Sequence, residues 1–138
     1  KAGTSNQKLV YDFGLNLGIS FQIKDDYLDT FGDGEKVGKK IGGDILQNKK
    51  TYLLITALNK AKGVQLNELL RLLSKTEGDE KINAVKNIFE DLGVKTDAEV
   101  LIDSYFNKAI DAISRIPIQP QKKHPLLSLS KMIYDREF

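Results

Sequence analysis

Apolar residues recur at three- and four-residue spacing along most of the chain, and a two-residue alternation persists nowhere. That spacing matches the 3.6-residue period of an α-helix rather than the period of a β-strand. The pattern predicts an all-α fold whose short connections favour antiparallel neighbouring helices. The expected helices cover residues 6–31, 48–62, 65–75, 79–92, 96–115 and 126–135.

The first expected helix, residues 6–31, is apolar around most of its circumference. A helix of this kind is normally covered by neighbours on several sides. Gly14 and Gly18 lie within it, and each glycine costs a helix interior up to about 1 kcal/mol relative to alanine. The close approach of another helix or of a ligand would explain both glycines. The apolar positions are Leu9, Phe13, Leu15, Leu17, Ile19, Phe21, Ile23 and Leu28.

Glycine and proline mark the breaks between the helices. Five glycines between residues 32 and 44 exclude a regular helix across that span. Gly63 and Gly93 follow apolar helical runs, in the position where glycine commonly ends a helix. The linker 116–124 contains two of the three prolines.

Composition excludes several classes of function. Hydrophobic residues make up 41% of the 138 positions and charged residues 29%, which is ordinary for one globular domain. The net charge of +2 predicts no strong attraction to nucleic acid. No apolar run is long enough for a membrane span and no signal peptide is visible, so we expect a cytoplasmic protein. The absence of cysteine excludes disulfides, thiolate metal sites and cysteine nucleophiles.

Three carboxylates gather near the end of the first helix, in the run Phe21-Gln-Ile-Lys-Asp-Asp-Tyr-Leu-Asp29. At about 100° per residue, Asp25, Asp26 and Asp29 fall on one side of the helix, with Gln22 one turn earlier. Like charges at this spacing repel each other, and burial increases the cost. A hard divalent cation would offset it, because oxygen ligands select magnesium, calcium or manganese. The alternative is a solvated acidic face, although such a face usually lies on a helix with a polar half.

A basic, glycine-rich segment follows the carboxylates directly. It contains Lys36, Lys39 and Lys40, with Lys49 and Lys50 a few residues later. Glycines let a backbone approach an anion closely, and lysine binds phosphate as a point charge. Taken alone, the segment is more typical of a lysine-rich surface loop. Together with the acidic helix, it favours a site where a metal joins carboxylates to a diphosphate and lysines neutralise the remaining charge. The spacing of a P-loop is absent.

The run FQIKDDYLDTFGDGEKVGKKIGGDILQNKKTY, residues 21–52, strongly resembles the second aspartate-rich region of trans-isoprenyl diphosphate synthases. The resemblance implies an isoprenoid-synthase-type helical bundle, of which residues 1–138 are the C-terminal part of one polyprenyl synthetase domain. The first aspartate-rich motif of that family and its upstream basic motif are absent from this chain. Because Lys1 stands first and Met132 is the only methionine, we expect a fragment of a longer protein.

The resemblance also implies roles for individual residues. Asp25 is expected to bind magnesium directly, with Asp26 and Asp29 supporting the metal and Asp44 lying in its water shell. Gln22 resembles the glutamine beside the allylic substrate. Lys39 and Lys49 resemble the lysines that hold the allylic diphosphate, and Asp25, Asp26 and Lys39 are the expected catalytic residues. Lys40 and Arg136 receive no role.

The implied reaction is a magnesium-dependent condensation of isopentenyl diphosphate with an allylic diphosphate, of the geranyl, farnesyl or geranylgeranyl diphosphate synthase type. The diphosphate-bridged magnesium is the expected cofactor, and a homo-oligomer, specifically a dimer, is the expected assembly. With half of the family's motifs missing, we expect the isolated chain to be inactive. The alternatives are a non-catalytic partner subunit of a heteromeric prenyl synthase, a diphosphate-binding helical domain, and a terpene cyclase. A cyclase usually carries asparagine and serine or threonine in its second metal motif.

Overall fold

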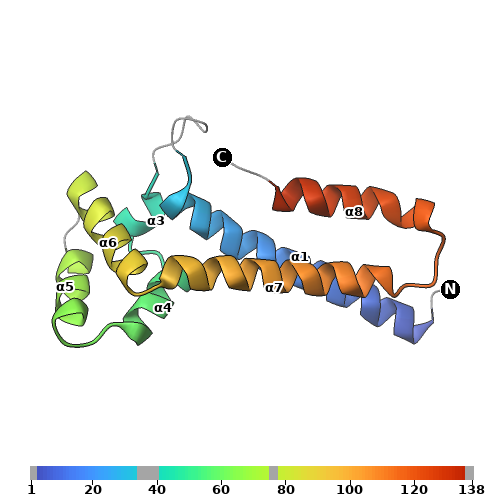
Figure 1. The fold of residues 1–138 in the computed structure, drawn as a ribbon, viewed down its shortest axis with the longest axis horizontal. Helices are drawn as coiled ribbons and strands as arrows, with labels where there is room; N and C mark the ends of the chain where they lie inside the picture. Colours follow the sequence, from blue (N-terminus) through green and yellow to red (C-terminus); the bar gives the residue numbers. More distant parts are fainter. Residues whose placement is uncertain (1–2, 34–40, 75–77, 136–138) are drawn as a thin grey trace. The chain divides into compact units, whose positions relative to one another are not determined.

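The computed structural model of the chain describes residues 3–33, 41–74 and 78–135, and every regular element in these ranges is an α-helix (Figure 1). The predicted all-α fold class is therefore confirmed. The helices are α1 (Thr4–Phe31), α3 (Gly43–Leu46), α4 (Tyr52–Lys60), α5 (Gly63–Ser74), α6 (Asp79–Asp91), α7 (Val94–Ser114) and α8 (Pro120–Tyr134).

The chain forms two compact units. Unit 1 contains Lys1–Gln22 and Val100–Arg136, whereas unit 2 contains Ile23–Glu99. Helices α1 and α7 each contribute residues to both units. The acidic end of α1 and the segment that follows it therefore belong to unit 2.

Unit 1 is built around a small apolar core between the first part of α1 and the second part of α7. Phe13 supplies the large side chain, and small residues of α7 such as Ala109 and Ala112 make room for it. Side chains at three- and four-residue spacing thus bury one stripe of each helix. The core consists of Phe13, Ala109, Ala112, Ile113 and Ile116, with Leu9, Leu17 and Leu127 packed against it.

Polar contacts connect the three helices of unit 1. The Ser20 hydroxyl donates a hydrogen bond to the Ile102 carbonyl oxygen at 3.0 Å. Tyr134 of α8 stacks on Phe106 of α7, with ring centroids 4.1 Å apart, and its hydroxyl donates to Asp103 at 2.5 Å. The two contacts of Tyr134 hold α8 alongside α7, and the two helices run antiparallel (Figure 1).

Unit 2 is organised around α6, which packs against α3, α4 and α5. Phe89 of α6 is 2% exposed, and Leu53 and Leu69 are completely buried. Burying apolar surface of this extent is the main stabilising contribution to a small helical unit. The other buried apolar residues of the unit include Ile45, Leu54, Ala57, Leu72, Ile82, Val85, Ile88, Val94 and Ala98.

Two predicted helix boundaries are wrong. The second helix was expected to begin at Asn48, but α4 begins at Tyr52 because Thr51 caps it, accepting the Leu54 N–H at 3.2 Å. The last helix was expected at 126, but α8 begins at Pro120 and contains Pro125. Pro120 is well accommodated at the first helical position, where no intrahelical N–H bond is required, whereas Pro125 lies inside the helix.

In the described residues, no other helix approaches the two α1 glycines closely, and the alternative of a nearby ligand stays a prediction. A Cβ atom added at Gly14 or Gly18 would meet no heavy atom within 4 Å. Large apolar side chains on the same part of α1 are also exposed, among them Tyr11 at 67% and Leu15 at 46%. Within the described ranges, α1 is therefore covered on fewer sides than its pattern predicts. None of the helices described is long and apolar enough to cross a membrane.

Candidate functional site

The carboxylates at the end of α1 differ in their exposure. Asp26 is buried, with 7% of its surface exposed, whereas Asp25 and Asp29 are half-buried. The buried residues Ile23 and Thr30 lie on the covered side of the same helical segment. The acidic group is thus only partly solvated, as the apolar surroundings in the sequence predict.

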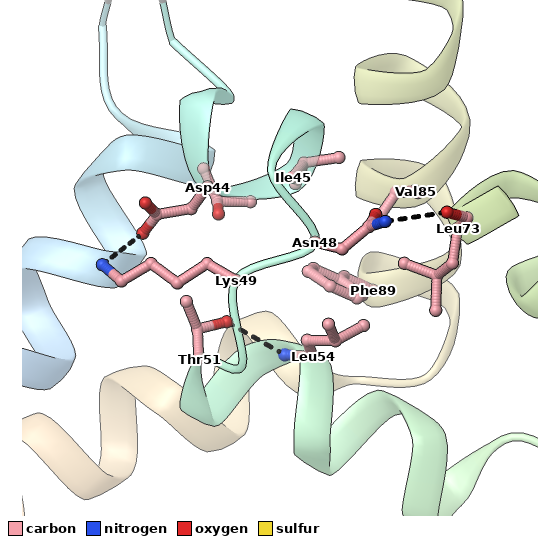
Figure 2. Close-up of a pocket in the computed structure, with 10 residues that line it drawn as sticks. Asp44, Ile45, Asn48, Lys49, Thr51, Leu54, Leu73, Val85 and Phe89 are labelled. Atoms are coloured by element: carbon pink, nitrogen blue, oxygen red, sulfur yellow. Dashed lines mark hydrogen bonds and ion pairs between the residues drawn. The ribbon is translucent and has the colours of Figure 1, made fainter. Parts of the chain in front are cut away.

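Lys49 provides the counter-charge for this acidic end of α1. Its Nζ lies 3.0 Å from Asp26 Oδ1 and 2.9 Å from Asp44 Oδ2, and Figure 2 shows the pairing with Asp44. The hydrogen bonds to Asp44 and Asp26 raise the pKa of Lys49. The side chain of Lys49 is nevertheless 45% exposed. The ammonium group therefore joins two acidic residues, while almost half of the Lys49 side chain remains exposed.

Asp29 connects α1 to the short helix α3. The backbone N–H of Asp44 donates to Asp29 Oδ2 at 2.8 Å. Burial raises the pKa of Asp29, as do the negative charges of Asp44 and Asp25, while the hydrogen bond from Asp44 and the charge of Lys49 lower it. The net rise means that the ionised form is less favoured than in a solvated aspartate, and a further cation would stabilise it.

The backbone around Gly42 places α3 against the end of α1. The Gly42 N–H donates to the Asp29 carbonyl oxygen at 2.7 Å. Gly42 has φ of 88°, and a Cβ atom there would lie 2.7 Å from the side chain of Ile82. Only glycine satisfies both requirements, because the left-handed conformation is unfavourable for most residues and α6 occupies the space. At position 42, the packing of α6 and the backbone conformation therefore require glycine.

Asn48, which the sequence does not single out, precedes Lys49 and adopts a positive φ of 50°. Its amide nitrogen donates to the Leu73 carbonyl oxygen at 2.8 Å, as Figure 2 shows. Its amide oxygen accepts a hydrogen bond from Lys81 Nζ at 2.7 Å. The residue before Lys49 is thus bound to both α5 and α6.

A pocket in unit 2 lies beside this arrangement (Figure 2). Asp44, Asn48 and Lys49 form its polar part, and Leu54 and Phe89 belong to its apolar part. The remaining lining residues are Thr30, Ile45, Thr51, Leu73 and Val85. The pocket thus connects the polar residues of α3 and of the segment after it with the apolar core of unit 2.

The fold brings four of the expected site residues together: Asp26, Asp29, Asp44 and Lys49. Asp25 is near enough for its charge to raise the pKa of Asp29. Gln22 is exposed on α1 and belongs to unit 1. Lys39, with Lys36 and Lys40, lies outside the described residues.

The donor set of this cluster is suited to a hard cation that shares its ligands with a phosphate. Within the described residues, no three acidic or histidine side chains are arranged to hold a metal ion by themselves. Magnesium commonly takes one or two protein carboxylates and completes its shell with water and phosphate oxygens. Asp26 and Asp29, with Asp25 nearby, meet that smaller requirement.

The family model described as "Polyprenyl synthetase" matches residues 1–92. A curated "Geranylfarnesyl diphosphate synthase" of Aeropyrum pernix is 33% identical over 128 residues, which are 93% of this chain and 39% of that protein. A solved structure titled "Crystal structure of geranylgeranyl pyrophosphate synthase" has a TM-score of 0.84 at 36% identity, covering 99% of this chain and 43% of the other.

A second solved structure is a geranylgeranyl pyrophosphate synthase from Corynebacterium glutamicum, complexed with isoprenyl diphosphate and magnesium. It has a TM-score of 0.83 at 26% identity and covers 94% of this chain and 37% of the other. This chain thus spans about two fifths of the length of the proteins it matches.

The fold and the cluster define an all-helical protein with acidic residues at the end of one helix and a lysine paired with them. The chain belongs to the polyprenyl synthetase family. The family recognised in residues 21–52 is therefore confirmed.

Proposed function

We propose that this chain contributes the allylic-diphosphate side of the active site of a prenyl diphosphate synthase. The observation that carries the proposal is the position of Lys49, a half-exposed side chain whose ammonium lies between Asp26 and Asp44. A cation beside a carboxylate group can neutralise a diphosphate while the carboxylates bind the metal that accompanies it. Family membership supports prenyl transfer as the reaction.

Magnesium is the proposed cofactor, with Asp25, Asp26 and Asp29 as the residues that would hold it and Asp44 supporting its bound water. When bound, it would neutralise diphosphate oxygens and polarise the bond to the departing group. Two observations support this assignment: the gathering of Asp26, Asp29 and Asp44 around one lysine, and the related structure complexed with isoprenyl diphosphate and magnesium.

In the proposed reaction the carbon–oxygen bond of the allylic diphosphate breaks, and its electron pair leaves with the diphosphate. The double bond of isopentenyl diphosphate attacks the allylic carbon to form a carbon–carbon bond. The adduct then loses a proton, which the departed diphosphate can accept. Lys49 and Lys39 would stabilise the charge of the leaving diphosphate, and Gln22 would lie beside the allylic chain.

The other expectations for the whole protein remain predictions. They are that residues 1–138 are the C-terminal part of one polyprenyl synthetase domain, that the protein is cytoplasmic, and that it forms a homodimer. The chain is also expected to be inactive alone, because it spans about two fifths of the length of the synthases it matches. A non-catalytic partner subunit is the second candidate, although such a subunit would not need the pairing of Lys49 with Asp26 and Asp44.

The test is calorimetric titration of the 138-residue chain with farnesyl diphosphate, in magnesium and in EDTA. We expect magnesium-dependent binding that Asp25→Asn or Lys49→Ala weakens at least roughly tenfold. The matched controls are Asp91→Asn and Lys62→Ala, which make the same charge changes at exposed positions. Binding that is no tighter in magnesium than in EDTA would contradict the proposed site.

A turnover assay with magnesium, isopentenyl diphosphate and farnesyl diphosphate separates the site from the complete enzyme. The chain alone should give no longer prenyl diphosphate, even where it binds the allylic substrate. Sustained turnover would show that the chain contains a complete active site and would contradict its proposed role as one part of that site.

A further inference from the structure

Lys81 is a buried cation outside the site described above. It lies on α6 and is 1% exposed, although lysine is among the residues least often buried in proteins. Burial lowers the pKa of Lys81. Because burying an ammonium group is costly, its hydrogen-bond partners indicate which part of the structure it stabilises.

Two of these partners belong to the segment that carries Lys49. Lys81 Nζ donates to Asn48 Oδ1 at 2.7 Å and lies 3.5 Å from the Leu46 carbonyl oxygen. Leu46 is the last residue of α3, and Asn48 follows it by two positions. A buried group on α6 thus binds the chain immediately before Lys49.

Asn48 transmits this contact to Lys49 through the backbone. The side chain of Asn48 has both its oxygen and its nitrogen engaged, by Lys81 and by the Leu73 carbonyl oxygen. These bonds hold the residue at a φ of 50°, which asparagine tolerates better than most residues do. That angle sets the direction in which the chain enters Lys49, whose own N–H donates to the Asp44 carbonyl oxygen at 2.9 Å.

We propose that Lys81 is a positioning residue that acts through Asn48 to place the Lys49 ammonium between Asp26 and Asp44. The inference rests on the proposed function, because it gives the position of Lys49 its importance for diphosphate binding. Without the Lys81 contact, the segment would be less ordered and the Lys49 side chain would sample many rotamers. Fixing that side chain when a ligand binds would then cost conformational entropy. The contact from Lys81 removes part of that cost before the ligand arrives.

The alternative is that Lys81 only stabilises the packing of α3 on α6. A double-mutant cycle distinguishes the two roles, using calorimetry with inorganic pyrophosphate and magnesium. Lys81→Met keeps the aliphatic stem and removes the donor, and we expect it to weaken binding roughly three- to tenfold. In a Lys49→Ala background the same change should have no further effect. An equal loss in both backgrounds would overturn the proposal, and Lys62→Met is the control for loss of one lysine charge.

Carbon NMR of the lysine side chains tests the position of Lys49 without any ligand. The Cε signal of Lys49 should move toward that of a solvated lysine in Lys81→Met and stay in place in Lys62→Met. Asn48→Gly removes the acceptor while tolerating the positive φ, so it should move the same signal if Lys81→Met does not fold. An unchanged signal in the folded variants would overturn the proposal.

The two proposals fail in different ways. If the wild-type chain does not bind pyrophosphate in magnesium, the proposed function fails, while the NMR signal of Lys49 still decides the role of Lys81. If the wild type binds and Lys49→Ala does not, but Lys81→Met binds as the wild type does, only the positioning role is overturned.

Discussion

The carboxylate of Asp29 accepts the backbone N–H of Asp44 at 2.8 Å, which joins the end of α1 to the start of α3. Asp44 in turn pairs with Lys49, so the connection leads from the acidic helix to the basic residue of the site. A residue expected to support a metal therefore also determines where a second acidic residue lies. If Asp29 supports the metal as proposed, stability and metal binding depend on the same carboxylate.

The two roles of Asp29 can be separated by substitution. Asp29→Ala removes the acceptor for the Asp44 N–H and should lower the free energy of unfolding by about 1 to 2 kcal/mol. Asp29→Asn keeps an acceptor oxygen and should lose less stability, yet it should weaken binding of magnesium pyrophosphate as much as alanine does. Urea denaturation and calorimetry measure the two effects. Equal stability of the two variants would contradict the structural role.

Lys49 should have opposite effects on magnesium alone and on magnesium pyrophosphate. Its ammonium neutralises Asp26 and Asp44, so Lys49→Met should strengthen binding of magnesium alone roughly two- to fivefold. The same change removes the partner of the diphosphate and should weaken binding of magnesium pyrophosphate roughly 10- to 100-fold. Calorimetry with each ligand measures both, and Lys62→Met is the matched control. Changes of the same sign would argue against this pairing.

Gly42 should tolerate no side chain. Gly42→Ala introduces a Cβ atom 2.7 Å from Ile82 at a φ of 88°, and should cost about 1 to 3 kcal/mol of unfolding free energy. Shortening the obstructing side chain in Gly42→Ala/Ile82→Ala should restore only part of the loss, since the backbone strain remains. Thermal melts of both variants and of Ile82→Ala give the comparison. Gly3→Ala, where a Cβ atom meets nothing within 4 Å, is the control.

We expect the contribution of Tyr27 to the free energy of unfolding to change at alkaline pH. Burial raises the pKa of Tyr27, and its hydrogen bond to Glu99 at 2.5 Å and the charges of Glu99 and Glu90 raise it further. An unfolded tyrosine ionises near pH 10, so above that pH the unfolded chain releases a proton that the folded chain retains. The stabilisation is therefore complete below about pH 10 and decreases as pH rises toward the folded pKa.

The measurement for Tyr27 is urea denaturation of the wild type and Tyr27→Phe between pH 8 and pH 11. The wild type should be more stable at pH 8, and the difference should narrow above about pH 10. Tyr11→Phe removes an exposed tyrosine and is the control. A stability difference that is constant over this range would contradict the assigned cause.

The sequence predicted a helix correctly where the apolar periodicity ended next to a glycine. An example is α6, which ends shortly before Gly93. The start of α8 was not predicted, because Pro120 was assigned to the linker 116–124 and the last helix was expected to begin only after Pro125. Proline in a first turn favours a helix, whereas the same residue in a helix interior opposes it. Sequence spacing alone does not distinguish these two situations.

The site was predictable where neighbouring residues share one helix face, and less so where tertiary packing decides. Resemblance to the family placed Asp26, Asp44 and Lys49 in one site, and the structure brings them together. The contact of Lys81 with Asn48 spans 33 residues. A lysine on an amphipathic helix is ordinarily expected in solvent, so only the packing of α6 against α3 reveals it.

The central claim is that the acidic end of α1 and Lys49 bind a metal and a diphosphate together. A crystal structure of the chain with manganese and pyrophosphate tests it directly, because manganese is located by its anomalous scattering. The account predicts an anomalous peak roughly 2.1 Å from a carboxylate oxygen of Asp25, with pyrophosphate bound to the metal and to Lys49 Nζ. A peak away from Asp25, Asp26 and Asp29, or pyrophosphate bound out of reach of Lys49, would contradict it.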